Sequence, residues 1–174
     1  MTVRIRPARA AEGGALIDIE RATGARFRDV GMPEIADDDP GSVEELARYA
    51  EDGRSWVAVD DANTPLAYVL VAVVDGNAHI EQLSVLPAAQ GTGLGRALLD
   101  HVATWALGRG VPALTLTTFR DVPWNAPLYE HLGFRVLAEP ELGPELRALR
   151  DSETAHGLDP TIRVCMIRPV HAVD

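Results

Sequence analysis

The chain has 174 residues, 47% of them hydrophobic, and a formal net charge of −10 at pH 7. A chain of this length and composition is typical of one domain with a hydrophobic core, so we expect a single domain over residues 1–174. The acidic balance argues against a nucleic-acid partner, because affinity for a phosphate backbone comes largely from clustered Lys and Arg. It is compatible with a cationic partner, or simply with solubility.

Cysteine usage and apolar runs exclude further classes of protein. Cys165 is the only cysteine, which rules out an internal disulfide, a C-x-x-C redox pair and a cysteine-based zinc site. The five histidines have no metal-ligand spacing, so we expect no metal. The N-terminus lacks an apolar signal segment, and runs such as Ala67 to Val74 are too short to span a membrane. We therefore expect a cytoplasmic protein without a membrane partner.

Hydrophobic periodicity predicts two helices and four strands in the first half of the chain. In chain order they are a strand over 2–6, helices over 10–27 and 42–52, and strands over 55–59, 66–74 and 78–85. Ser42 with Glu45 fits a capping box at the start of the second helix. The hairpin-type dipeptide Asp75-Gly76 joins the last two strands, which favours antiparallel pairing. A polar loop over 31–40, with three consecutive aspartates, is expected between the helices.

The strand over 78–85 leads into a glycine-rich turn, Gln90-Gly91-Thr92-Gly93-Leu94-Gly95, and then into a helix over 94–109. Small residues let a ligand approach the backbone, and the helix start adds the positive end of its dipole. Such a turn is suited to a phosphate or pyrophosphate. It is not a Walker A loop, because no Lys-Ser or Lys-Thr occurs, and it is not a dinucleotide fingerprint, because Arg96 occupies the third glycine position.

The second half of the chain continues the alternation of strands and helices. Its predicted elements are a strand over 113–119, a short helix around 128–132 ended by Gly133, a strand over 134–137, a helix over 144–156 and a strand over 162–168. A strand, helix and strand of this length favour a right-handed crossover, so the strands over 78–85 and 113–119 are predicted to be parallel neighbours.

Two motifs together resemble a known family. Gln90, Gly93 and Gly95 fit the pattern [QR]-x-x-G-x-[GA], and the segment from Tyr129 to Phe134 is similar to the signature Y-x-x-x-G-F. In this order the motifs resemble those of the GNAT superfamily of N-acetyltransferases, and the similarity extends from residue 3 to about 168. The resemblance implies an α/β (α+β) fold, namely a central mixed, mostly antiparallel sheet of six to seven strands flanked by helices. It also implies that the parallel central strands splay apart within a single acetyltransferase domain.

The resemblance further implies acetyl-CoA as co-substrate and names the residues that would bind it. These are Leu83, Ser84, Val85, Gln90, Gly91, Thr92, Gly93, Leu94, Gly95 and Arg96, with the pyrophosphate at the turn. The alternative for Arg96 is an exposed helix residue whose side chain reaches solvent. One position departs from the family pattern, because Val122 stands where many members have an asparagine seven residues before the tyrosine. Asn125 is the candidate substitute for that amide.

Acetyl transfer to an amine needs a neutral amine. A lysine-like amine has a pKa near 10.4, so deprotonating it at pH 7 costs about 4 to 5 kcal/mol, and either a base or a site that lowers that pKa is required. Glu81 is the candidate base, because family members often carry a glutamate at this position and its alternation with Leu83 and Val85 suits a cleft residue. An edge or surface carboxylate is the alternative. His79 could assist, although a half-buried strand histidine is the simpler interpretation.

Tyr129 is the candidate acid for the departing CoA thiolate, or else a packing residue with a hydrogen-bonded hydroxyl. The predicted function is therefore N-acetyl transfer from acetyl-CoA to a primary amine by direct attack in a ternary complex. The acceptor is a small molecule or a peptide, and the run Asp37 to Asp39 is either a solvated loop or a flank of the acceptor channel. The alternative function is a non-catalytic acyl-CoA-binding module. The resemblance also allows a homodimer.

Overall fold

The computed structural model describes residues 2–171, which form two compact units. The first unit contains residues 2–71 and 81–101, and the second contains 72–80 and 102–171. Strands β3 and β4 and helix α4 run through both units. The elements up to α4 are β1 Arg4–Pro7, η1 Ala10–Glu12, α1 Gly13–Gly24, η2 Ala25–Val30, α2 Pro33–Ala36, α3 Val43–Glu51, β2 Ser55–Val59, β3 Pro65–Val74, β4 Asn77–Val85, η3 Pro87–Ala89 and α4 Leu94–Gly108. The later elements are β5 Ala113–Phe119, α5 Ala126–His131, β6 Arg135–Val136, η4 Glu139–Glu141, α6 Pro144–Ala155, η5 Pro160–Ile162 and β7 Arg163–Pro169.

The strands form a seven-stranded mixed sheet in the order β1-β2-β3-β4-β5-β7-β6. Strands β4 and β5 are parallel, with Ala78 opposite Leu114 and His79 opposite Thr115. Antiparallel pairing joins β1 to β2, β2 to β3, β5 to β7 and β6 to β7. The mixed sheet with parallel central neighbours confirms the predicted fold class. The splay of these neighbours stays a prediction.

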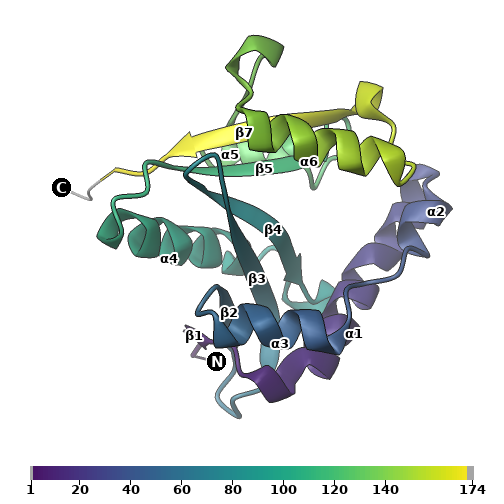
Figure 1. The fold of residues 1–174 in the computed structure, drawn as a ribbon. Coiled ribbons are helices and arrows are strands. Elements are labelled where there is room, and N and C mark those ends of the chain that lie inside the picture. Colours follow the sequence, from purple (N-terminus) through teal and green to yellow (C-terminus); the bar gives the residue numbers. More distant parts are fainter. Residues whose placement is uncertain (1, 172–174) are drawn as a thin grey trace. The chain divides into compact units, whose positions relative to one another are not determined.

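In the first unit, α1 and α3 lie side by side and cover β2 and β3 (Figure 1). Their shared core consists of Ala8, Leu16, Ile19, Leu46, Val57, Val59, Tyr68 and Leu70. Gly13 lets the two helices approach, because a Cβ atom there would lie 3.0 Å from Val43 Cγ1 and 3.2 Å from the Val43 carbonyl oxygen. A glycine that weakens helix propensity is therefore needed for packing.

The helical part of the first unit differs from expectation at two places. The helix predicted over 10–27 is a 3₁₀ turn, an α-helix over Gly13–Gly24 and a second 3₁₀ segment that ends at Gly31 with φ of 74°. The loop predicted over 31–40 contains the helical turn α2, because Pro33 fixes a φ that suits a first helical position. The Ser42 half of the capping box predicted for α3 is confirmed, since the Ser42 hydroxyl oxygen accepts a hydrogen bond from the Glu45 N–H at 3.1 Å.

In the second unit, α6 runs alongside β7 and buries Leu142, Leu146 and Cys165 in a small core (Figure 1). Cys165 is a buried core residue, as predicted. The Asp75 carboxylate accepts hydrogen bonds from the N–H groups of Glu145 and Leu146, each at 2.9 Å, and so caps α6. Asp75 and Gly76 both have positive φ, 51° and 75°, which confirms the predicted hairpin turn.

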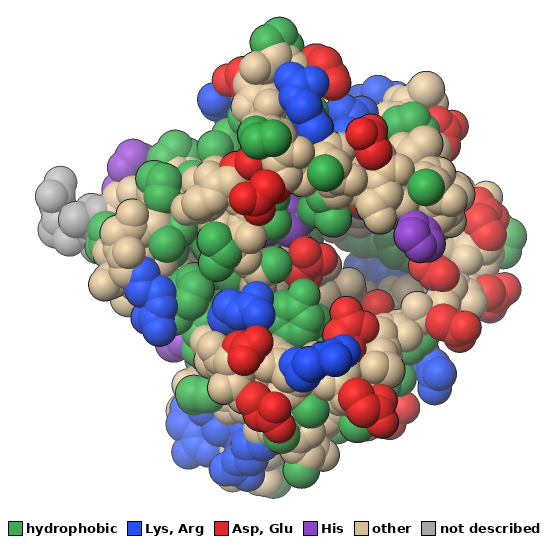
Figure 2. Space-filling view, in the orientation of Figure 1, with side chains coloured by type: hydrophobic (Ala, Val, Ile, Leu, Met, Phe, Trp, Pro, Cys, Tyr) green, Lys and Arg blue, Asp and Glu red, His purple; other side chains and the backbone are tan. Residues whose placement is uncertain are grey.

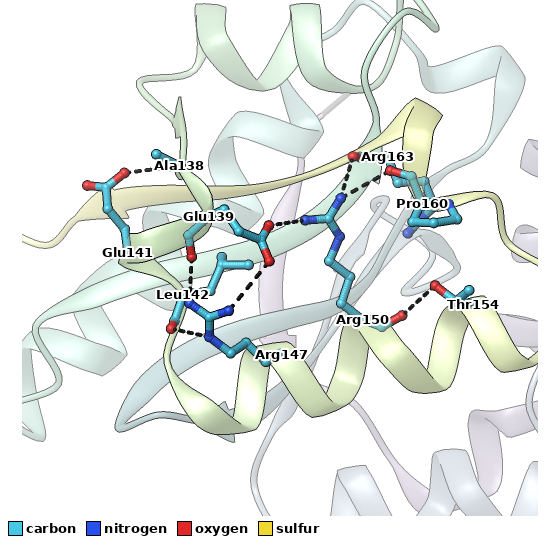
Figure 3. Close-up of polar contacts among 9 residues, drawn as sticks. All are labelled: Ala138, Glu139, Glu141, Leu142, Arg147, Arg150, Thr154, Pro160 and Arg163. Atoms are coloured by element: carbon cyan, nitrogen blue, oxygen red, sulfur yellow. Dashed lines mark hydrogen bonds and ion pairs between the residues drawn. The ribbon is translucent and has the colours of Figure 1, made fainter.

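Arginines of α6 hold the segments on either side of this helix (Figure 3). Arg150 Nη1 lies 3.1 Å from Glu139 Oε2, and Arg150 Nη2 donates to the Pro160 carbonyl at 3.1 Å. Arg147 Nη2 donates to the Glu139 carbonyl at 2.7 Å. These contacts fix η4 and η5 against α6. No helix within residues 2–171 is both long enough and apolar enough to cross a membrane.

Candidate functional site

The turn between β4 and α4 has the backbone that its glycines predict. Gly91 and Gly93 have positive φ, 76° and 86°, a conformation that other residues adopt with strain. Helix α4 begins at Leu94, and the Gly93 carbonyl accepts the N–H of Ala97 at 3.0 Å. The first N–H groups of a helix have no partner inside it, so they are free to meet an anion. The turn therefore fits a phosphate-bearing cofactor.

Side chains from α1 and η2 fix this turn and the end of β4. The Val85 carbonyl accepts hydrogen bonds from Thr23 Oγ1 at 3.0 Å and from Gln90 Nε2 at 3.1 Å. The other end of the Gln90 amide, Oε1, accepts from Arg26 Nη1 at 2.9 Å. Both ends of the Gln90 side chain are thus held by protein groups. Any contact of Gln90 with a cofactor would come from its main chain.

The remaining cofactor residues predicted in the first unit divide by exposure. Gly91, Thr92, Gly93 and Arg96 are exposed, whereas Leu83, Val85 and Gly95 are half-buried and Leu94 is buried. Gly95 packs on the strand, since a Cβ atom there would lie 3.9 Å from Leu83 Cδ2 and 4.0 Å from Val85 Cγ2. Acidic side chains are spread over the visible face in Figure 2 rather than gathered in one patch. They accord with the net charge of −10.

A chain of hydrogen bonds that the sequence does not reveal crosses the first unit from β4 to α1. Gln82 Nε2 donates to Ser84 Oγ at 2.8 Å, the Ser84 hydroxyl is bonded to Tyr68, and Tyr68 Oη donates to Glu20 Oε2 at 3.1 Å. Ser84 and Tyr68 are fully buried. Burial raises the pKa of Glu20 and, together with the Glu20 charge, that of Tyr68. Only the main chain of Ser84 is therefore suited to contact a cofactor.

We expect Tyr68→Phe to lower the free energy of unfolding by about 1 to 3 kcal/mol, because it leaves the half-buried Glu20 carboxylate and the buried Ser84 hydroxyl without their shared partner. Urea unfolding at pH 7 measures the loss. Tyr49→Phe is the matched control, since Tyr49 is only half-buried and should lose less. Equal losses in the two variants would contradict the role given to the Tyr68 hydroxyl.

Glu81 is exposed on β4 in the first unit, the unit that also contains the turn. Its carboxylate acts electrostatically on Tyr49 of α3, whose pKa is raised by burial, then by Glu81 and then by Glu45. The Arg54 guanidinium lies over the Tyr49 ring, 5.1 Å from its centroid, and opposes this shift in the Tyr49 pKa. The candidate base is therefore exposed and lies within electrostatic range of Tyr49 on α3. Alternation in the sequence favours a cleft residue, and the exposure is compatible with a base that meets a soluble acceptor.

Tyr129 and Asn125 belong to the second unit. The Tyr129 ring packs edge-on against Phe134 with centroids 5.7 Å apart, and burial of its hydroxyl raises the pKa of Tyr129 to about 12. A phenol with that pKa is protonated at neutral pH and can donate. Asn125 Oδ1 accepts from Thr118 Oγ1 at 2.7 Å, so its amide is held against β5.

His79 is buried rather than half-buried, with 2% of its surface exposed. Its Nδ1 lies 2.9 Å from Thr115 Oγ1, on the strand opposite. Burial lowers the pKa of His79 to about 4, so the imidazole is neutral at pH 7. Within residues 2–171 there is no group of three or more His, Cys, Asp or Glu side chains that could hold a metal ion.

Comparison with known proteins gives consistent matches. A family model described as the acetyltransferase (GNAT) family matches residues 19–134. The peptidyl-lysine N-acetyltransferase YjaB of Salmonella typhimurium is 28% identical over 143 residues, covering 82% of this chain and 90% of that protein. A GNAT-family acetyltransferase of Staphylococcus aureus superposes with a TM-score of 0.72 at 14% identity, over 98% of this chain and 100% of that chain. The PaiA N-acetyltransferase of Thermoplasma acidophilum, solved with coenzyme A, superposes with a TM-score of 0.68 at 15% identity, over 97% of this chain and 99% of that chain.

Proposed function

The chain belongs to the acetyltransferase (GNAT) family and is an acyltransferase, and we propose that it transfers an acetyl group from acetyl-CoA to a primary amine by direct attack in a ternary complex. Residues 1–174 would act as one catalytic domain. The observation that carries this proposal is the turn before α4, where Gly91 and Gly93 adopt positive φ and the helix start offers N–H groups to a phosphate.

In this proposal the main chain at Gln90, Gly91, Gly93 and Gly95 holds the pyrophosphate, with Arg96 beside it. Bound acetyl-CoA supplies an activated acetyl thioester. Main-chain N–H groups near Val85 are assigned to stabilise the negative charge that develops on the acetyl oxygen. Leu83 and Ser84, on the same strand, would contact the arm of the cofactor through their main chain, and Asn125 is assigned to the same arm.

Two side chains are assigned to proton transfer. Glu81 accepts the proton that the acceptor amine loses as its nitrogen attacks the acetyl carbonyl. Forming the neutral amine at pH 7 costs about 4 to 5 kcal/mol, which is why a nearby proton acceptor is needed. Tyr129 donates a proton to the departing thiolate. The phenol is protonated at neutral pH, as a proton donor must be, and burial, which raises its pKa to about 12, makes it a weaker acid than an exposed tyrosine.

The acceptor proposed is an amine on a peptide or a small molecule. A peptide lysine is supported by the name of the relative from Salmonella typhimurium, a peptidyl-lysine N-acetyltransferase. The net charge of −10 and the acidic run at Asp37 to Asp39 favour a cationic acceptor of either kind. Asp37 itself forms an ion pair with Arg28, so Asp38 and Asp39 are the members of the run assigned to attract the acceptor.

The test is release of free CoA thiol from acetyl-CoA, measured against lysine-containing peptides, polyamines and amino acids. Acceptor-dependent release establishes the acetyltransferase and ranks the acceptors. If acetyl-CoA raises the melting temperature while no amine in the panel is acetylated, the non-catalytic acyl-CoA-binding module becomes the better interpretation. If acetyl-CoA neither binds nor reacts, both interpretations fail.

We expect Tyr129→Phe to lower kcat about tenfold to a hundredfold, because loss of the acid leaves a thiolate as the leaving group. The ring and its contact with Phe134 are kept, so the melting temperature and the affinity for CoA should stay unchanged. Steady-state kinetics with the best acceptor give kcat, and thermal unfolding provides the structural control. An unchanged kcat would remove Tyr129 from the mechanism.

A further inference from the structure

We propose that Arg26 is a further cofactor-binding residue, whose guanidinium binds a phosphate group of CoA beside the turn that starts at Gln90. The proposal rests on the proposed use of acetyl-CoA. Arg26 lies on η2, outside both sequence motifs, and its contact with Gln90 joins residues 64 positions apart. Sequence patterns therefore give no indication of it.

The geometry begins with the Gln90 side chain. Because Nε2 donates to the Val85 carbonyl at 3.1 Å and Oε1 accepts from Arg26 at 2.9 Å, the amide acts as a bridge between strand β4 and Arg26. Thr23, one turn of helix before Arg26, donates to the same Val85 carbonyl at 3.0 Å. The guanidinium is thus held at the first residue of the phosphate-binding turn by contacts that do not depend on a ligand.

The positive charge of the Arg26 guanidinium suits it to bind a phosphate group of CoA. Gln90 is neutral, so this hydrogen bond positions the Arg26 guanidinium and does not itself neutralise its charge. CoA is a polyanion, whereas this chain carries a net charge of −10, so a cation at the turn offsets an unfavourable overall field. Arginine also presents several N–H donors in a plane that matches phosphate oxygens.

Partial burial strengthens the interaction. Arg26 is half-buried, and burial lowers its pKa, while the nearby Asp29 acts in the opposite direction. A cation that has lost part of its hydration gains more from an anionic ligand than an exposed one does. Arg96, in the first turn of α4, is exposed. Arg26, although it lies outside the motif, should therefore contribute more to phosphate binding than an exposed arginine such as Arg96.

The experiment is isothermal titration of the full chain with CoA, 3′-dephospho-CoA and pantetheine. Arg26→Met is compared with Arg21→Met, which removes an exposed arginine five residues earlier. We expect Arg26→Met to weaken CoA at least tenfold, Arg21→Met to change it less than twofold, and neither to change pantetheine. Arg26→Lys should recover part of the affinity. Thermal unfolding without ligand confirms that each variant is folded.

The three ligands separate the two kinds of phosphate. If the effect of Arg26→Met vanishes with 3′-dephospho-CoA, Arg26 binds the 3′-phosphate; if it persists there and vanishes with pantetheine, Arg26 binds the pyrophosphate. CoA binding by Arg26→Met within twofold of the wild type, or equal weakening of all three ligands, overturns the proposal and leaves the proposed function intact. Failure of the wild type to bind CoA overturns both.

Discussion

Lowering the pH from about 7 to about 4 should remove roughly 3 kcal/mol from the free energy of unfolding through His79 alone. The imidazole is 2% exposed, and its pKa in the folded protein is about 4, against 6.5 for an ordinary histidine. A difference of that size corresponds to about 1.4 kcal/mol per pKa unit. His79 thus stays neutral in the folded chain while the unfolded chain takes up a proton.

The direction and the pH window follow from this difference. Well above pH 6.5 both states carry a neutral His79, so its contribution to stability is complete. As the pH falls from 6.5 towards 4, only the unfolded state gains a proton, and stability declines. Below about 4 the folded state is protonated too, and the loss from this residue levels off.

Urea unfolding at intervals between pH 7.5 and 4 measures this loss. His79→Gln is the variant to compare, because an amide can still bond to Thr115 and does not titrate in this range. Between pH 7.5 and 4 the free energy of unfolding of this variant should fall less than that of the wild type, and the difference should equal the loss assigned to His79. His101→Gln is the matched control, since burial lowers the pKa of His101 as well. Parallel curves for the wild type and His79→Gln would show that the imidazole is not desolvated.

The sequence is a good guide to elements and a poor guide to their partners. The change from alternation to helical spacing around Gly91 and Gly93 is local, and it located β4, the turn and α4 within a residue or two. The position of β7 between β5 and β6 depends on contacts between distant segments. Periodicity carries no information about such contacts, so the strand order could not be derived from it.

The same distinction applies to the candidate site. Glycines at the turn were predictable because positive φ selects them. The bond from Tyr68 to Glu20 and the bond from Arg26 to Gln90 join residues 48 and 64 positions apart, and neither pair has a spacing that marks it. The sequence alone makes Gln90 a pyrophosphate ligand. Only the structure shows that its side chain is bonded to Val85 and Arg26.

We expect Glu81→Gln to lower kcat about a hundredfold to ten-thousandfold at pH 7, the range typical for loss of a general base. This loss of kcat should become smaller as the pH approaches the pKa of the acceptor amine, because the acceptor then loses its proton without help. Affinity for CoA should not change. Steady-state kinetics between pH 7 and 9.5 test both points. A loss that is the same at every pH would argue for a structural role, and an unchanged kcat would remove Glu81 from the mechanism.

Tyr49 provides a test of this variant that does not depend on turnover. The Glu81 charge raises the pKa of Tyr49, so Glu81→Gln should lower that pKa, which an ultraviolet titration of the phenol can detect. Glu45→Gln is the matched control, since Glu45 also raises the pKa of Tyr49. Both variants should lower the Tyr49 pKa, and only Glu81→Gln should lose kcat with the pH dependence of a missing base. If Glu45→Gln shows the same kinetic loss, the combined electrostatic effect of Glu81 and Glu45, rather than proton transfer to Glu81, accounts for the activity.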